Sequence, residues 1–401
     1  MANTLTPIDV YALVNAIVSE ATGRTDLAVV DTSSFVAVGE TLLRTGLENT
    51  INAISTVICR TIFSVRPYRG SLDSLRVGQE RWGAMVRKVV TLYSEAEASQ
   101  DWNTDLNATQ LADGNSIDMF KIKKPLCVQL NFVGTKVLQK HITMFRDQLA
   151  LAFHDETEFA RFIDAVMVQF NNEIELINEN EARATVLNLI AGNIAANIDV
   201  VDLVAEYNTR NNTHLTRAQL LSSDYISDFM KFVAAQIKVK SAQLENMTVS
   251  HHLSLSAYAP IMRHTPKARQ KMIMYAPAFL EMEAQVYSSL FNPQYLDIGT
   301  FEGVNFWQSE KTPTAINVLP NILNVNTGES QNATAAVTED YVLGVLFDEE
   351  ACGIMPQFEY ASTTPFNSAG GYANTFVHWR FLSYIDQTEN QVVFVLGAGG
   401  E

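Results

Sequence analysis

Apolar residues recur at helical spacing near the start of the chain. Thr6 can cap a helix and Pro7 suits its first position, and up to Gly23 the apolar residues then follow one stripe: Val10, Leu13, Val14, Ile17 and Val18. A second amphipathic stretch runs from about Ser34 to Cys59, with its apolar residues on or near one face: Leu42, Leu43, Leu47, Ile51, Ile54 and Val57. The pattern predicts two helices before any strand, either an arm that packs on another element or an ordinary helical subdomain.

A longer apolar stripe begins after Asp155, which with Glu158 resembles a capping box. Its members are Phe159, Phe162, Ile163, Val166, Phe170, Ile174 and Ile177, and weaker helical character continues through Leu187. Because no Gly or Pro occurs before Gly192, the pattern predicts one helix from Asp155 to Ile190, about 35 residues and roughly 50 Å long. We expect the stripe, Phe170 included, to be buried within the subunit. The stripe is too irregular for a coiled coil.

Between these helical regions, two strand patterns flank a long polar interval. Residues from Trp82 to Tyr93 are rich in strand formers, and clean alternation runs from Phe120 to Phe132. Pro125 cannot donate a ladder hydrogen bond, which favours an edge strand. The residues from Ser94 to Asp118 show no apolar period, and a loop of that length is uncommon inside a compact domain. The pattern predicts a long hairpin with a polar tip that projects from the body.

The remaining chain mixes helices with strands that are distant in sequence. Residues 199–300 alternate short helices with loops and contain three clear elements: a helix from Asp224 to Leu244, a buried strand from Met272 to Tyr275, and a helix from Pro277 to Leu290. The C-terminal part is rich in strands: Tyr341 to Phe347, Ile354 to Ala361, Thr375 to Ile385, and Gln391 to Leu396. Neither a βαβ rhythm nor an internal repeat is visible. The sequence therefore predicts an α+β fold with long-range strand pairing.

Composition narrows the class of protein. Hydrophobic residues make up 47% of the 401 residues, which excludes a mainly disordered chain. The formal net charge of −16 argues against an overall basic nucleic-acid-binding protein. Cys59, Cys127 and Cys352 lie far apart, which disfavours a disulfide framework and a zinc module. Neither a signal peptide nor a membrane-spanning stretch is visible, so we expect a soluble chain that is cytoplasmic at synthesis.

Motifs for catalysis and ligand binding fail on inspection. Gly397 to Gly400 follows a strand but has no helix after it, so these residues cannot cradle a phosphate. His251 and His252 are adjacent, and neighbours on a helix point about 100° apart, so they cannot share a metal ion. His378 lies in an aromatic strand, where a packed imidazole is the simpler interpretation. We expect no catalytic, cofactor-binding or metal-binding residues.

Charge is distributed unevenly along the chain. Residues 60–90 are basic and contain Arg60, Arg66, Arg69, Arg76, Arg81, Arg87 and Lys88 against Asp73 and Glu80. Residues 155–181 are acidic and contain Asp155, Glu156, Glu158, Asp164, Glu173, Glu175, Glu179 and Glu181 against Arg161. The asymmetry suits a contact between copies of the chain, with Arg76, Arg81 and Arg87 facing Glu173, Glu175 and Glu179. Two separately solvated faces are the alternative.

The order of elements resembles the major capsid protein of tailed bacteriophages, whose shell fold is named after the Hong Kong 97 phage. The resemblance covers nearly the whole chain: an N-terminal arm, a long hairpin, one very long helix, a mixed middle domain and a β-rich return. Val342 to Gly353 resembles the late strand, Phe-Asp turn and Ala-x-Gly return of that family. Tyr372 to Val395, with its polar turn at Asp386 to Asn390, resembles the C-terminal strands of coat proteins from small podoviruses.

The resemblance implies a division of the chain into named parts. Residues 1–62 would be the N-terminal arm and 63–133 the extended E-loop. Residues 134–192, with the spine helix, and 354–386, with the long strands, would form the peripheral domain. Residues 193–353 would form the axial domain, and 387–401 its final strand and tail.

The function implied is structural: self-assembly into hexamers and pentamers of an icosahedral or prolate shell around packaged double-stranded DNA. A separate scaffolding protein and a portal would be partners, with DNA bound non-specifically and no membrane involved. The protein would reside in the virion capsid, and in the host cytoplasm during assembly. An encapsulin-type nanocompartment shell would resemble the same element order, and a cytosolic enzyme or binding protein without recognisable motifs is the alternative from another class.

Overall fold

The computed structural model describes residues 7–23, 28–30, 32–45, 53, 71–76, 85–94, 96, 113–114, 116, 118–120, 122–124, 126–153, 156–255, 260–287 and 300–400. The chain divides into two compact units. Unit 1 consists of Met1–Ala84, Gly134–Arg183 and Ile354–Ser383. Unit 2 consists of Met85–Val133, Ala184–Gly353 and Tyr384–Glu401. The names arm, E-loop, peripheral domain and axial domain stay predictions.

Unit 1 begins with a small helical core. It contains α1 (Pro7–Thr22), α2 (Thr32–Thr45), a short 3-10 turn η1 (Asp73–Leu75) and α4 (Arg146–Ala152). The predicted first helix is confirmed, and Gly23 ends it with a left-handed φ of 67°. Of the second predicted helix, the described part ends at Thr45, and except for Ala53 the residues from there to Cys59 lie outside the described residues.

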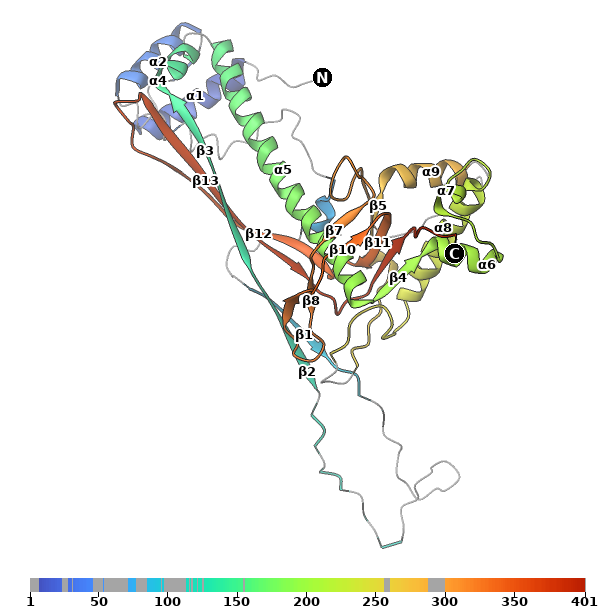
Figure 1. Cartoon of the computed structure of the whole chain (residues 1–401). Coiled ribbons are helices and arrows are strands. Elements are labelled where there is room, and N and C mark those ends of the chain that lie inside the picture. Colours follow the sequence, from blue (N-terminus) through green and yellow to red (C-terminus); the bar gives the residue numbers. More distant parts are fainter. Residues whose placement is uncertain are drawn as a thin grey trace. The chain divides into compact units, whose positions relative to one another are not determined.

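The long helix α5 (Glu156–Ala196) contributes residues to both units and confirms the predicted spine-like helix (Figure 1). Phe159, at its N-terminal end, is fully buried and packs its ring against Phe35 and Phe153. The side chains of residues 162–171 lie outside the described residues, so the burial of Phe170 stays a prediction. The helix continues past Gly192, where we expected its end, and stops before Asn197, which has a φ of 48°.

Unit 1 also contains a three-stranded sheet in the order β12-β13-β3, formed by β12 (Cys352–Thr363), β13 (Tyr372–Ile385) and β3 (Thr135–Phe145). β3 runs antiparallel beside β13 over eleven residue pairs (Figure 1). The sequence analysis missed β3 because two positions that face α5 are lysines. Lys136 pairs with Glu181 and Lys140 with Glu173, which breaks the expected apolar alternation.

Unit 2 is built on a five-stranded mixed sheet in the order β4-β14-β11-β5-β6. Its strands are β4 (Asp199–Asp202), β5 (Gln270–Tyr275), β6 (Thr300–Val304), β11 (Val342–Asp348) and β14 (Gln391–Val395). Every residue of β11 and β14 is buried, as expected for central strands covered on both faces. The predicted strands Tyr341 to Phe347 and Gln391 to Leu396 are therefore confirmed as β11 and β14. The predicted strand Met272 to Tyr275 is confirmed as part of β5.

Four helices accompany this sheet: α6 (Leu203–Asn211), α7 (Arg217–Leu220), α8 (Ile226–Leu244) and α9 (Ala276–Tyr287). α8 and α9 confirm the two predicted helices, and the apolar face of α8 is buried through Phe229, Val233 and Ile237. Although the sequence shows no βαβ rhythm, β5, α9 and β6 form one βαβ unit, because β5 and β6 pair in parallel.

Among the residues of unit 2 that the structure describes, three two-stranded ribbons complete the unit. Two are short: β7 (Ile316–Val318) with β10 (Val337–Glu339), and β8 (Asn321–Leu323) with β9 (Ser330–Asn332). The third pairs β1 (Met85–Thr91) with β2 (Cys127–Val133) in antiparallel register and is the predicted hairpin. β2 begins at Cys127, not at Phe120 as the alternation predicts. Met119, Phe120 and Ile122 are each at least 80% exposed, so this part of the alternation does not mark a buried face.

Candidate functional site: a buried polar turn at the ribbon root

The connection between β13 and β14 is a turn that is buried within unit 2. Its five residues Asp386, Gln387, Thr388, Glu389 and Asn390 are each at most 5% exposed. Turns normally lie in water, and buried polar groups are costly unless they are hydrogen-bonded. The polar groups of this turn therefore need partners from other segments, and the cluster that they form is the candidate functional site.

Some polar groups of the turn form hydrogen bonds within the turn. The Asp386 carboxylate accepts hydrogen bonds from the Thr388 backbone N–H at 2.9 Å and from the Thr388 hydroxyl at 2.6 Å. This is the local side-chain-to-backbone bonding for which Asp is favoured in turns. The Asp386 N–H donates to the carbonyl of Ala351, and the Asn390 carbonyl accepts from the N–H of Asp348. The turn is thereby tied to the segment that follows β11.

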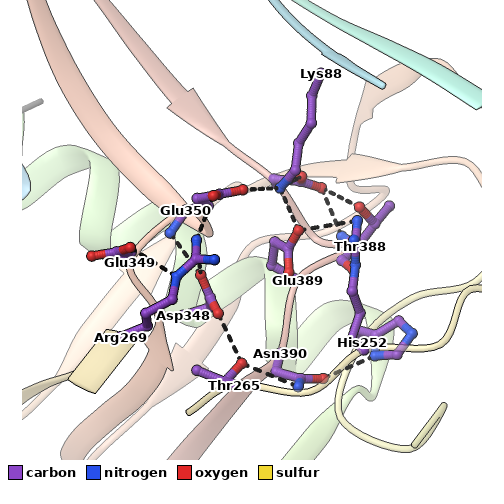
Figure 2. A network of polar contacts seen from close by, with 12 residues as sticks. Lys88, His252, Thr265, Arg269, Asp348, Glu349, Glu350, Thr388, Glu389 and Asn390 are labelled. Carbon is purple, nitrogen blue, oxygen red and sulfur yellow. Dashed lines mark hydrogen bonds and ion pairs between the residues drawn. The ribbon is translucent and has the colours of Figure 1, made fainter. Parts of the chain in front are cut away.

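Lys88 of β1 reaches into this turn. Its ammonium donates to Asp386 at 2.9 Å and to Glu389, and it lies 3.2 Å from Glu350 (Figure 2). Burial alone would lower the pKa of Lys88, but the charges and hydrogen bonds of Asp386 and Glu389 raise it above its ordinary value. Lys88 is therefore a fully charged group that occupies the place between three carboxylates.

Two arginines add further positive charge beside the same carboxylates. Arg263 lies 3.0 Å from Glu389 and donates from Nε to the carbonyl of Thr388 at 3.1 Å. Arg269 pairs with Glu349 at 2.8 Å and also with Glu350 (Figure 2). Burial raises the pKa of Glu389 despite its cationic neighbours. The pKa of the more exposed Glu350 is lowered, because the hydrogen bond from Arg269 and the charge of Lys88 outweigh its partial burial.

A chain of side-chain hydrogen bonds continues from the turn to Asp348. The Asn390 side chain contacts His252 Nδ1 at 3.0 Å and donates to the Thr265 hydroxyl at 3.2 Å. Thr265 donates to Asp348 at 2.9 Å (Figure 2). His252 Nε2 lies 2.7 Å from the carbonyl of Ile261. Burial is the main cause that lowers the pKa of His252. Four side chains from three segments are thus linked in one buried line.

The same region holds the root of the β1–β2 ribbon by apolar packing. The inward residues of both strands form one layer with the loop that contains Leu255 and Ile261: Val90, Leu92, Val128 and Leu130. The Phe132 ring of β2 lies 5.6 Å from the ring of Tyr384, next to the turn. Both strands of the ribbon are therefore fixed to unit 2 near the buried turn. The arrangement can hold and orient the ribbon.

The charged residues chosen from the sequence fall in two places. In unit 1, Glu175 pairs with Arg76, and Glu173 pairs with Lys140 of the same chain. Glu179 is buried, 2.8 Å from Arg183, and accepts a hydrogen bond from Ser71 at 2.9 Å. In unit 2, Arg87 is exposed on β1, next to Lys88. Arg81 lies outside the described residues.

Sequence reasoning missed the importance of Lys88, which was counted only as one member of a basic segment. A signal for it exists, because Lys88 shares one face of β1 with the buried Val90. A lysine on the apolar side of a strand requires a buried counter-charge. Its partners could not be found this way, since they lie some 260 to 300 residues further along the chain, as the separation of 301 between Lys88 and Glu389 illustrates.

Within the part of the chain that the structure describes, no group of three or more His, Cys, Asp or Glu side chains is arranged to hold a metal ion. Among the same described residues, no helix is both long and apolar enough to cross a membrane. Cys127 and Cys352, the two cysteines that are described, are free thiols.

Comparisons with known proteins agree with the fold. A chain in the capsid structure of Staphylococcus phage Andhra superposes with a TM-score of 0.55 at 8% identity, covering 84% of this chain and 87% of that chain. A chain in the structure of the head fiber and inner core protein gp22 of native bacteriophage P68 gives a TM-score of 0.52 at 10% identity, covering 84% and 86%. No curated protein matches the sequence significantly. At these identities, the likeness establishes the fold alone.

The sequence itself matches a family model, described as Phi29-like phage major capsid protein, over residues 14–395. The match spans both units and includes β1, β2, α5 and the buried turn. The predicted α+β capsid fold and the predicted structural role are thereby confirmed. This chain belongs to the Phi29-like phage major capsid protein family and is a structural protein of a phage shell.

Proposed function

We propose that this chain forms the hexamers and pentamers of a closed icosahedral or prolate shell that encloses packaged double-stranded DNA. The observation that carries the proposal is the family match over nearly the whole chain. By the same resemblance, a separate scaffolding protein and a portal act as partners, and assembly takes place in the host cytoplasm. With a net charge of −16, we expect the shell to hold DNA non-specifically, mainly by enclosure.

Exposed apolar residues of the hairpin support assembly between copies. Met119, Phe120, Ile122 and Leu126 are 83%, 80%, 82% and 61% exposed in the single chain. Large apolar side chains gathered in one segment are unfavourable in water, and such patches commonly mark interaction sites. A neighbouring copy in a shell would remove them from water.

Deletion of Ser99 to Gly114 tests the role of the hairpin. We expect the shortened protein to stay folded and soluble, because β1 and β2 keep their pairing and their apolar layer. It should no longer close shells when it is expressed with its scaffolding protein and examined by electron microscopy. Normal shells from the deletion variant would contradict the assignment of this segment to contacts between copies.

The contact between the basic segment and the acidic helix face of a neighbouring copy is also retained as a proposal. Reversing Arg81 and Arg87 to Glu should leave the fold intact but weaken assembly, and reversing Glu173 and Glu175 to Lys should partly restore it. Since Glu173 and Glu175 also pair within the chain, thermal melting of each variant is the control. Each exposed pair is worth only ~0–1 kcal/mol, but it recurs in every subunit. If neither charge reversal changes the yield of shells, the basic and acidic segments are separately solvated faces and do not contact each other between copies.

An encapsulin-type nanocompartment is the second candidate, and it differs from a virus shell in what it encloses. The family match favours the phage shell. Particles purified from infected cells should contain double-stranded DNA protected from added nuclease. Particles that contain a protein cargo and no nucleic acid would favour the nanocompartment. A monomeric protein in those cells would favour a motif-poor enzyme or binding protein.

A further inference from the structure

Lys88 connects the β1–β2 ribbon to the rest of unit 2 by directional polar contacts. Its ammonium pairs with Asp386 and Glu389, which lie between β13 and β14, and with Glu350, which follows β11. Charge-assisted hydrogen bonds are short and about twice as strong as neutral ones. Like other hydrogen bonds, they weaken steeply when the donor angle departs from linearity. A rotation of β1 about its own axis would separate Lys88 from these carboxylates.

The apolar layer beneath the ribbon does not impose the same restriction. Val90, Leu92, Val128 and Leu130 are held against Leu255 and Ile261 by burial from water. Burial is non-directional, so this layer keeps the ribbon attached but tolerates changes in its angle. Attachment and direction are therefore supplied by different residues of the same two strands.

The carboxylates also depend on Lys88. The side chains of Asp386 and Glu389 are 2% and 7% exposed, so their charges are withheld from water. Arg263 pairs with Glu389, whereas Asp386 forms its ion pair with Lys88. An uncompensated buried carboxylate is strongly unfavourable. The turn and the ribbon therefore favour a single mutual position.

From this geometry we propose that Lys88 is a positioning residue for assembly, which sets the direction in which the β1–β2 ribbon leaves unit 2. The inference rests on the proposed shell-forming function, since the ribbon is the segment whose distal residues meet neighbouring copies. A fixed ribbon direction fixes the angle between neighbours. That angle determines whether a growing sheet of subunits closes, and at which size.

The test compares Lys88→Met, which removes the charge and shortens the unbranched side chain by one atom, with two matched variants. Lys88→Arg restores a cation at the same position. Lys124→Met removes the same charge from an exposed position of the hairpin. Hydrogen exchange of free subunits reports on the ribbon, and electron microscopy of shells assembled with the scaffolding protein reports on closure and diameter.

For Lys88→Met, we expect exchange in residues 85–91 and 127–133 to accelerate roughly tenfold or more, because hydrogen bonds to charged groups are lost. Exchange in β11 should not change. Shells should be open or broadly distributed in diameter, whereas Lys88→Arg and Lys124→Met should give wild-type shells. Lys88→Met shells that close with the wild-type diameter, or unchanged exchange in the ribbon, would overturn the proposal. A purely structural role would lower the melting temperature without changing particle diameter.

Two further results keep the test decisive. If Lys88→Met does not fold, the charge-balanced Lys88→Met/Glu389→Gln variant takes its place under the same two measurements, and its failure to fold would also overturn the proposal. If the wild-type chain forms no shells with its scaffolding protein, the proposed function fails. In that case the exchange comparison on free subunits still decides whether Lys88 holds the ribbon.

Discussion

At the scale of residues, His252 combines a buried ring with two polar contacts. Nε2 lies 2.7 Å from the Ile261 carbonyl, and Nδ1 lies 3.0 Å from the Asn390 side chain. Nδ1 faces the side-chain oxygen of Asn390, so both ring nitrogens face acceptors and the protonated ring can donate to both. The neutral ring can donate to only one of them, and it can accept from Asn390 only if the Asn390 amide turns over. The charge state of His252 is therefore linked to the orientation of Asn390, and through Asn390 to Thr265.

We predict that this histidine makes unit 2 less stable in mild acid. Burial lowers the pKa of His252 below 6.5, and the nearby charges of Arg263 and His251 act in the same direction, against the hydrogen bonds. Because the folded pKa lies below the unfolded one, the unfolded chain binds more protons between the two values. Stability is therefore complete above about pH 6.5 and falls as the pH drops through the folded pKa.

Thermal melting of the free subunit at about pH 7.5 and about pH 5.5 checks this prediction. His252→Gln should be less stable at neutral pH but should lose less on acidification than the wild type. His378→Gln, which removes a histidine from unit 1, serves as the control for the loss of a histidine elsewhere in the chain. Because the pKa of Glu389 is raised in the folded chain, Glu389 stabilises the fold as the pH drops and partly offsets the loss caused by His252. Each variant is therefore compared with the wild type at the same pH. Equal slopes for wild type and His252→Gln would contradict the prediction.

At the scale of elements, the sequence predicts best those segments whose apolar pattern is not interrupted. α1, α8 and β11 follow from periodicity, since each buries one regular face or the whole element. β3 does not follow from it, because Lys136 and Lys140 share a strand face with Leu138 and Ile142 and pair with glutamates of α5. The strand β3 is formed by its pairing with β13 and by the ion pairs of its lysines with α5, which a local apolar pattern cannot predict.

The N-terminal end of α5 should be strongly sensitive to truncation of its aromatic residue. Phe159→Ala should cost ~3–5 kcal/mol, because the fully buried ring leaves a cavity beside Phe35 and Phe153. Leu176→Ala on the same helix, at a position 50% exposed, should cost about 1 kcal/mol or less. Denaturant unfolding of the free subunit measures both. Similar losses for the two variants would contradict the packing of this helix.

Gly192 should behave opposite to an ordinary helix glycine. Gly→Ala in a helix interior commonly stabilises by ~0.5–1 kcal/mol. At Gly192, however, an added Cβ would lie 2.5 Å from the Gln387 Nε2 atom, and Gln387 is held by the N–H of Leu323 at 2.6 Å. We expect Gly192→Ala to destabilise by ~1–3 kcal/mol. This close approach explains why the helix has a glycine at this position.

A double-mutant cycle separates this cause from others. Gly192→Ala combined with Gln387→Ala should be less damaging than the sum of the two single changes, because the clash disappears. Additive losses in denaturant unfolding would mean that Gln387 is not the group that excludes a side chain at Gly192.

At the scale of the whole molecule, the order of elements along the chain was sufficient to indicate the capsid family, and the family match confirms it. The buried turn was beyond sequence reasoning. Asp386 to Asn390 reads as an exposed polar turn, and its burial results from packing by segments as distant as Lys88 and Arg263. Local patterns predict elements and their order, whereas polar clusters built from remote segments require the folded chain.

The central claim is that copies of this chain form the shell. The most direct measurement is a cryo-electron microscopy reconstruction of particles purified from cells infected with the phage that encodes the chain. We predict closed shells of hexamers and pentamers, in which each subunit fits density for α5 and for the β1–β2 ribbon joined to the turn by Lys88. A shell built from a different polypeptide, with this chain absent or present only as a free monomer, would contradict the account.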